Sequence, residues 1–540
     1  MIRMDGAGLV DSAIREVPFD FATIQGVPDW RGTLAWPLSH ARAFSAGRVQ
    51  ERAYLNFANR LGDEKLRRVA LLGGGRAISV GLALTEAALC VQEEARAGIR
   101  LLGGPAELDI LRGEPPSSDK RPWQTDSPFK PMASPGGIWL RRLARVASYT
   151  PLWRLPATLI APTVTAVTHN GLLCADARRS PERVGFYHAE ALLSEARRHR
   201  SGRQGLIDIT DLAAAVADLL ARGEGLEEPF VCRLRSLLLP MLRTDFLKAA
   251  FDLDALAALA KLPKALWSGS GGYYPSRAVG IEVQRRGGCV TRFSHSGMAG
   301  MTEVVEPTAF TELAVSDRFV VETEQAAANL AATEALALID RFNRPVIVGS
   351  SGYPGLRRLP LVSHRRPTRR AVVYAPTILK GFRQFFPPLL PDVIYLDWQY
   401  RLVESMLRMP IDLICKPHPE GLLRGRIHPL AAVAPTTTKR FEEVMGEADV
   451  FVFDYAQSTT FYEALCTDRP IVYVDMGNLL FNKSVLPMIT RRCRVLQVRF
   501  DARNLPWIDE AELHEAICGG CDRADPGEFR ALLMGEGDVA

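Results

Sequence analysis

Short apolar runs alternate with longer amphipathic stretches along most of the chain. In the first half, residues 68–75 (RVALLGGG) predict a strand and a glycine turn followed by a helix, and residues 98–104 (GIRLLGG) predict another strand. Parallel strands joined by helices produce this alternation, because such strands are buried on both faces while each helix buries one. The sequence therefore predicts an α/β fold.

The second half repeats the pattern with clearer strand-like runs. These are AVVYAPT (371–377), PDVIYLDW (391–398), IDLICKPHP (411–419), ADVFVFDY (448–455) and RPIVYVD (469–475). They predict a doubly wound nucleotide-binding domain. Residues 181–260 have a mostly helical pattern, whereas 114–135 have a Pro- and Ser-rich composition typical of a loop.

The basic, proline-broken segment RRPTRR (365–370) predicts a domain boundary. We expect an N-terminal Rossmann-like domain over residues 1–365, with a helical insertion at about 114–200. Residues 366–540 are then the C-terminal Rossmann-like domain, the one expected to bind a nucleotide.

Composition narrows the function classes. A chain of 540 residues is too long for one core, and 66 Lys plus Arg against 61 Asp plus Glu give a net charge of +5, which is too weak for a nucleic-acid partner. Nine scattered cysteines are typical of a reduced, cytoplasmic protein, and the C-x-x-C at 518–521 lacks the second ligand pair of a zinc site. No stretch predicts a signal peptide or a spanning helix.

Two prolines bracket a histidine at the end of the predicted strand near residue 415. Lys416 and His418 alternate with Pro417 and Pro419, whose fixed torsions hold the imidazole in one direction. Ligands bind beyond the carboxyl ends of the strands in open parallel sheets, so this histidine is placed to donate to a phosphate. A strand-ending turn with a solvated histidine is the alternative.

A second strand end, FDYAQSTTFYEAL at 453–465, carries an acid, three hydroxyls and a glutamate. Asp454 follows the strand, and Ser458, Thr459 and Thr460 open a predicted helix, where free backbone N–H groups favour an anion. We expect phosphate binding here. The alternative is a T-x-x-E capping box formed by Thr460 and Glu463.

A third strand end lies in the N-terminal half, in CVTRFSHSGM (289–298). His295 is followed by Ser296 and Gly297, and a glycine at this position permits a sharp turn and close approach of a ligand. Histidine titrates near neutral pH, so it can exchange a proton with a substrate. A structural or solvated histidine is the alternative.

The order of these motifs resembles that of GT-B glycosyltransferases which build bacterial surface carbohydrates. YAPT (374–377), DYAQST (454–459) and DRPIVYVD (468–475) are similar to motifs of the CDP-glycerol glycerophosphotransferases of teichoic acid synthesis. His418-Pro419 and the hydroxyls of 458–460 are similar to the H-P and paired-hydroxyl motifs of bacterial sialyltransferases and capsule Kdo transferases. The resemblance covers roughly residues 266–475. It implies two Rossmann-like domains that face a cleft, with 1–365 on the acceptor side and 366–540 binding the nucleotide donor.

The resemblance also implies an activity. A CMP- or CDP-activated donor, with UDP-sugars left open, would pass its group to a surface polysaccharide or a lipid-linked glycan. His295 would be the catalytic base. The donor would be bound by Lys416, His418, Asp454, Ser458, Thr459, Thr460 and Glu463, with Glu463 on the ribose. No metal or cofactor is implied, because the nucleotide is part of the substrate.

The chain departs from the family pattern in three places. His295-Ser296-Gly297 stands where the glycerophosphotransferases have H-G, and Ala456 and Gln457 are inserted before Ser458. The Asp/Glu-Asp/Glu-Gly base motif of many sialyltransferases is missing from the first domain. These departures leave the exact placement of the histidine open and weaken a sialyltransferase assignment.

Residues 137–155 (GIWLRRLARVASYTPLWRL) mix tryptophans and leucines with four arginines. A basic amphipathic helix of this kind can lie in a membrane interface, whereas a core-facing helix with solvated arginines is the alternative, since Pro151 interrupts the pattern. We expect a cytoplasmic protein, with peripheral contact to the inner face of the membrane as a hypothesis.

Other functions fit parts of the sequence. A dehydrogenase would use Gly73-Gly74-Gly75 as a dinucleotide loop, but the third fingerprint glycine is replaced by Ile78. A nucleotide-sugar epimerase of the same fold and a non-catalytic GT-B-like assembly protein also stay open.

Overall fold

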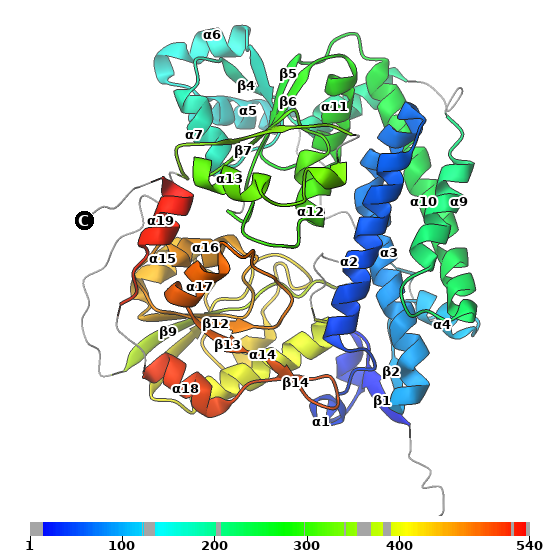
Figure 1. Cartoon of the computed structure of the whole chain (residues 1–540), viewed down its shortest axis with the longest axis vertical. Helices are drawn as coiled ribbons and strands as arrows, with labels where there is room; N and C mark the ends of the chain where they lie inside the picture. Colours follow the sequence, from blue (N-terminus) through cyan, green and yellow to red (C-terminus); the bar gives the residue numbers. More distant parts are fainter. Residues whose placement is uncertain are drawn as a thin grey trace, which may run out of the picture.

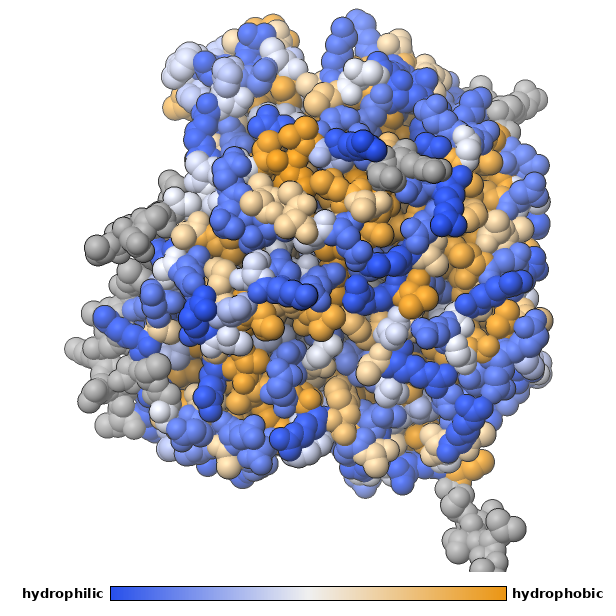
Figure 2. All heavy atoms as spheres, viewed as in Figure 1, coloured by the Kyte–Doolittle hydropathy of each residue, from blue (hydrophilic) through white to orange (hydrophobic). Residues whose placement is uncertain are grey.

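The protein contains two large parallel sheets, one in each half of the chain (Figure 1). The computed structural model describes residues 14–120, 122–123, 135–200, 207–295, 297–339, 342–353, 369–381, 390–519 and 523–535. The predicted α/β class is confirmed, because all strand pairs within the two large sheets are parallel. In Figure 2, hydrophilic residues cover much of the outline, and apolar residues gather toward the middle of the face.

The N-terminal sheet has six strands in the order β4-β3-β5-β6-β7-β8. Its strands are β3 (Val164–Ala166), β4 (Val184–Phe186), β5 (Ala265–Ser268), β6 (Cys289–Phe293), β7 (Arg318–Val321) and β8 (Val346–Gly349). The stretch expected as a helical insertion, 114–200, therefore supplies two strands of this sheet. These short runs with β-branched and aromatic residues are strands because β3 is paired and buried between β5 and β4, and β4 is buried at the edge beside β3.

The C-terminal sheet has five strands in the order β10-β9-β11-β12-β13. Its strands are β9 (Arg370–Ala375), β10 (Ile411–Cys415), β11 (Val450–Phe453), β12 (Ile471–Asp475) and β13 (Arg494–Gln497). The central strand β11 is fully buried along its length, as expected for a strand covered on both faces. The strand order reverses between β9 and β11, and this is the edge where such sheets bind ligands.

Helices connect the strands and surround the sheets. In chain order they are α1 (Trp30–Thr33), α2 (His40–Arg60), α3 (Glu64–Ala97), α4 (Glu107–Arg112), α5 (Pro135–Tyr149), α6 (Leu155–Ile160), α7 (Gly171–Arg179), α8 (Ala189–His199), α9 (Thr210–Ala221), α10 (Glu228–Ala257), α11 (Tyr274–Arg285), α12 (Glu306–Thr308), α13 (Glu324–Ala331), α14 (Asp392–Leu407), α15 (Phe441–Val444), α16 (Thr459–Leu465), α17 (Leu486–Arg492), α18 (Glu510–Cys518) and α19 (Gly527–Met534).

The prediction for residues 68–75 is wrong, because this stretch lies inside the 34-residue helix α3. Asp63 caps the start of α3 by accepting from the backbone N–H groups of Lys65 and Leu66, and Gly98 ends it in the left-handed conformation. Gly73 and Gly74 face the aromatic rings of neighbouring elements, so they serve close packing. The dinucleotide loop of a dehydrogenase is thereby excluded.

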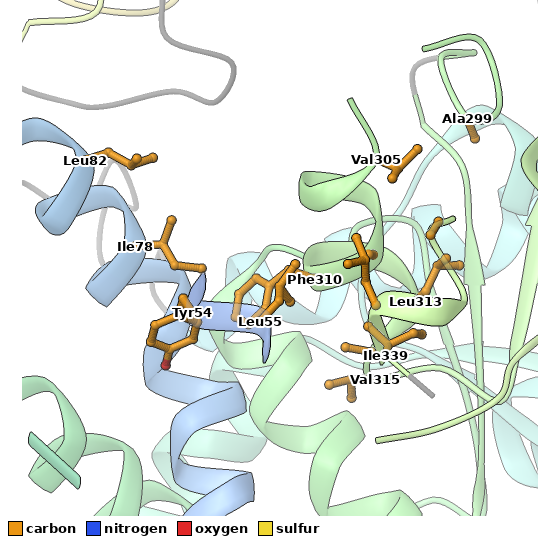
Figure 3. Close-up of a cluster of buried hydrophobic side chains, with 14 of the residues drawn as sticks. Tyr54, Leu55, Ile78, Leu82, Ala299, Val305, Phe310, Leu313, Val315 and Ile339 are labelled. Atoms are coloured by element: carbon orange, nitrogen blue, oxygen red, sulfur yellow. The ribbon is translucent and has the colours of Figure 1, made fainter. Parts of the chain in front are cut away.

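Helices α2, α3, α9 and α10 pack together at one side of the molecule, to the right of the sheets in Figure 1. Figure 3 shows part of the contact of α2 and α3 with the segment between β6 and β7. Tyr54 and Leu55 of α2 and Ile78 of α3 lie close to Phe310 of that segment. By length and composition α3 could cross a bilayer, but 78% of its most apolar window is buried inside the protein. This burial is typical of a core helix.

The stretch 391–398, predicted as a strand, forms the first half of helix α14. Most of this helix is buried, so its apolar residues leave no amphipathic pattern that distinguishes it from a strand. The strand predictions for β2 (Ile99–Leu102), β9, β10, β11 and β12 are confirmed.

A segment near each end of the chain packs against the opposite half of the molecule. β1 (Arg15–Pro18) pairs with β2, and this small sheet belongs to the same hydrophobic cluster as β9–β13. The N–H of Trp36 donates to the carbonyl of Arg503, next to the hairpin of β14 (Arg499–Phe500) and β15 (Pro506–Trp507). At the other end, α19 returns to the N-terminal half, where Thr323 donates to the carbonyl of Leu532 over 2.6 Å. Each half is therefore held by a segment from the opposite end of the described chain.

Candidate functional site

A cleft of about 830 Å³ lies between the carboxyl ends of the two sheets. Its walls come from the segments that follow β6 on one side and β9, β10 and β11 on the other. The predicted site residues that line it are His295, Lys416, His418, Ser458, Thr459, Thr460 and Glu463. The structure thus brings together seven of the eight residues selected from the sequence.

His295 follows β6 by two residues and is exposed to the cleft. The preceding Ser294 is anchored on β7, since its backbone N–H donates to the carbonyl of Val320 over 2.8 Å. Gly297 has a φ of 73°, a left-handed conformation that glycine adopts without strain. The chain therefore turns sharply at this strand end and leaves the imidazole in the opening of the cleft.

His418 lies opposite, after β10. The backbone N–H of Glu420 donates to its Nδ1 over 3.1 Å, which leaves the proton of the neutral ring on Nε2. Although the residue is exposed, the walls of the cleft desolvate the ring and lower the pKa of His418 below 6.5, and the charge of Lys416 acts in the same direction. At neutral pH this side chain therefore offers an N–H donor.

Ser458 is the N-cap of α16, and its hydroxyl accepts from the backbone N–H of Phe461 over 3.1 Å. It also lies 2.9 Å from the hydroxyl of Thr460. The capping box considered for Thr460 and Glu463 is wrong, because the helix begins two residues earlier than that motif requires. The three consecutive hydroxyls remain at the cleft surface.

Glu463 is consequently not used as a cap, and it lies between the cleft and a smaller cavity beside His295. Burial raises the pKa of Glu463 to about 7, and Glu442 acts in the same direction while Lys416 opposes it. Desolvation in turn lowers the pKa of Lys416. Glu463 thus lies in a polar cluster with Lys416 and Glu442, and its own carboxyl changes charge close to neutral pH.

Asp454 does not lie in the cleft. Its buried carboxylate accepts from the hydroxyls of Tyr374 (2.5 Å) and Tyr395 (2.8 Å) and from the indole N–H of Trp398 (3.1 Å). With three donors already bound inside the C-terminal core, it has no capacity for a nucleotide. Its expected donor-binding role is replaced by a structural one, tying β9, β11 and α14 together.

Sequence reasoning missed several residues of the site. Arg440 and Glu442 line the cleft from the segment before and within α15, and Thr311 and Glu312 line it from a π-helical turn. Glu322, directly after β7, lines the smaller cavity. The strand-end rule that selected His295 would also have found Glu322, because the glutamate follows the apolar run FVV.

No group of three or more His, Cys, Asp and Glu side chains suited to a metal ion occurs in the described part of the chain. No family model matches the sequence, and a search of curated proteins finds no match.

Proposed function

We propose that the protein is a glycosyltransferase or glycerophosphotransferase of the GT-B type. Its donor is a nucleotide-activated group, with CMP or CDP as the expected nucleotide, and its acceptor is a surface polysaccharide or a lipid-linked glycan. The main support is the cleft, in which His295 lies on one wall. The opposite wall carries two cations, a histidine and three hydroxyls: Lys416, Arg440, His418, Ser458, Thr459 and Thr460.

The proposed reaction uses the two walls for different steps. His295 accepts the proton of the acceptor hydroxyl, whose oxygen forms the new bond to the transferred group. The bond between that group and the leaving phosphate oxygen breaks, and its electron pair stays on the nucleotide. General-base chemistry of this kind suits a histidine near neutral pH.

The wall of the cleft that comes from the C-terminal sheet is suited to stabilise the negative charge that grows on the leaving nucleotide. The Nε2–H of His418, the ammonium of Lys416 and the hydroxyls of Ser458–Thr460 are donors that face the same cleft. A charge-assisted hydrogen bond contributes about 1.5–3 kcal/mol, whereas even a modest enzyme lowers its barrier by about 8 kcal/mol. Several donors are therefore needed together, as the cleft supplies them.

Nucleotide binding can be measured directly by thermal unfolding, because a bound ligand raises the melting temperature by mass action. We expect CMP or CDP to give a larger shift than UDP or GDP. The double variant Ser458→Ala, His418→Ala should lose this shift, when each protein is compared with and without nucleotide.

His428→Ala is the matched control, since His428 makes the same hydrogen bond with a backbone N–H but does not line the cleft. An equal nucleotide shift in the double variant and in wild type would contradict the proposed pocket. Release of free nucleotide only after an acceptor is added would distinguish transfer from epimerisation.

A membrane surface is the proposed site of the acceptor. Leu152 and Trp153, next to α6, are 80% and 76% exposed, and Ile160 is 84% exposed. Arg141 and Arg145 of the neighbouring helix α5 are also exposed. Apolar tips flanked by cations are suited to anionic lipid headgroups. The proposed location is the cytoplasmic face of the inner membrane.

A further inference from the structure

Glu322 is a buried acid that lines the same small cavity as His295. It follows β7 by one residue and is 2% exposed. In the register between β6 and β7, Phe293 pairs with Val320, so His295 and Glu322 each lie two residues beyond a paired position. The two side chains therefore emerge from neighbouring strands at the same edge of the sheet.

One oxygen of the Glu322 carboxylate is fixed and the other is not. Oε1 accepts from the hydroxyl of Ser294 over 2.8 Å, which sets the direction of the carboxylate. Oε2 is buried and has no hydrogen-bond partner among the described residues. An unsatisfied buried carboxylate oxygen is costly, so this oxygen needs a donor.

A second unsatisfied group lies beside it. The hydroxyl of Tyr462 is buried and has no hydrogen-bond partner within the described ranges. Tyr462 and Glu322 line a cavity of about 20 Å³ together with His295 and Glu463. This volume holds about one water molecule, and several polar groups are present to bind it.

We propose that Glu322 is a positioning residue for His295, acting through one ordered water that it shares with Tyr462. The water donates to Oε2 of Glu322 and connects it with the imidazole. Burial raises the pKa of Glu322, while the hydroxyl of Ser294, the nearby backbone N–H groups of Glu322 and Gly297 and, last, the charge of His295 oppose this rise. The carboxylate in turn orients the ring and stabilises the imidazolium that forms when the base takes its proton.

The inference rests on the proposed role of His295 as the base. Other titratable or charged groups also face this region and belong to its pH dependence. They are Tyr353 after β8, Tyr462 and Glu463 on α16, Glu442 on α15 and Lys416 after β10. A variant that removes only the Glu322 charge separates its effect from theirs.

The test is an NMR titration of the His295 ring, with its resonance identified by its loss in His295→Asn. In Glu322→Gln, which keeps an acceptor for Ser294, we expect the titration midpoint to fall by about 1 pH unit. Glu324→Gln is the control, because it removes an equal charge two residues along on an exposed position. Tyr462→Phe should give a smaller fall, since the water loses one partner.

The acid limb of the kcat/KM profile should move to lower pH by the same amount in Glu322→Gln, with a lower plateau. Equal midpoints in Glu322→Gln and wild type would overturn the positioning role, and equal midpoints in Tyr462→Phe and wild type would overturn the shared water. If the midpoints shift as expected but no donor supports transfer, the coupling stands and the proposed function fails.

Discussion

At the scale of single residues, two acids a few positions apart in one motif have opposite roles. Asp454 is surrounded by three hydrogen-bond donors in the core, whereas Glu463 faces a cleft and carries a pKa raised to about 7. Their types and spacing do not distinguish them. What separates them is the partner set, since Tyr374, Tyr395 and Trp398 come from 56 to 80 positions away in the chain.

The raised pKa of Glu463 predicts how stability depends on pH. The unfolded chain ionises this carboxyl near pH 4.5, while the folded protein keeps the proton up to about pH 7. The free energy of unfolding therefore falls as pH rises between these values. Replacing Glu463 by Gln removes this loss, so the variant should gain about 2 kcal/mol over wild type between pH 5 and pH 8.

Urea unfolding at the two pH values measures this difference. The exposed Glu303, changed to Gln, is the control and should show no such gain. A constant difference between Glu463→Gln and wild type at both pH values would contradict the raised pKa.

At the scale of elements, local pattern was sufficient where a segment is buried on both faces by its neighbours in a parallel sheet. β10, β11 and β12 were predicted because their apolar runs are short and end in polar strand ends. The strand ends in turn predicted most of the cleft residues. The strand prediction for RVALLGGG was wrong because a glycine triplet permits both a turn and close packing between helices. Here the glycines pack against the rings of Phe246, Tyr54 and Phe310, which the local sequence does not reveal.

Gly74 provides a test of that packing. A Cβ at this position would lie 2.7 Å from the Tyr54 hydroxyl and 2.8 Å from Cζ of Phe310, both buried. Gly74→Ala should therefore destabilise the protein by about 1–3 kcal/mol, although alanine favours helix. The neighbouring Gly75 is exposed and its Cβ would meet only Phe310 at 3.8 Å.

Gly75→Ala is thus the matched control and should stabilise the same helix by about 0.5–1 kcal/mol. Denaturant unfolding of both variants gives the comparison. Equal stabilisation by the two alanines would show that Gly74 is not packed against these rings.

At the scale of the whole molecule, charge is concentrated near one end of the N-terminal sheet. Residues 135–183 contain seven arginines against one aspartate and one glutamate, a formal net charge of +5, which equals that of the entire chain. The small helix α6 of this region lies at the upper edge of Figure 1. Leu152 and Trp153, just before α6, and Ile160, its last residue, are exposed. We give the name α5–α6 surface to its exposed residues Arg141, Arg145, Leu152, Trp153 and Ile160.

The α5–α6 surface should bind vesicles that contain phosphatidylglycerol and not vesicles of phosphatidylcholine alone, since cations and apolar tips act together at an anionic bilayer. Changing both Trp153 and Ile160 to Ser should reduce co-sedimentation several-fold. Ile427→Ser is the control, because Ile427 is 85% exposed outside this surface. Equal sedimentation of the double variant and wild type would rule out docking through α5–α6.

The crossing of the chain ends has a consequence for biosynthesis. The backbone N–H of Trp36 donates to the carbonyl of Arg503, and the side-chain amide of Asn504 donates to the carbonyl of Trp36 over 2.8 Å. The N-terminal segment leaves the ribosome hundreds of residues before these partners exist. Strand β1 can pair with β2 once residues 99–102 have been made, but the contacts of Trp36 cannot form until synthesis has passed residue 504. The docking of this segment onto residues 503–504 is therefore a late event, which joins parts of the chain that are synthesised far apart in time.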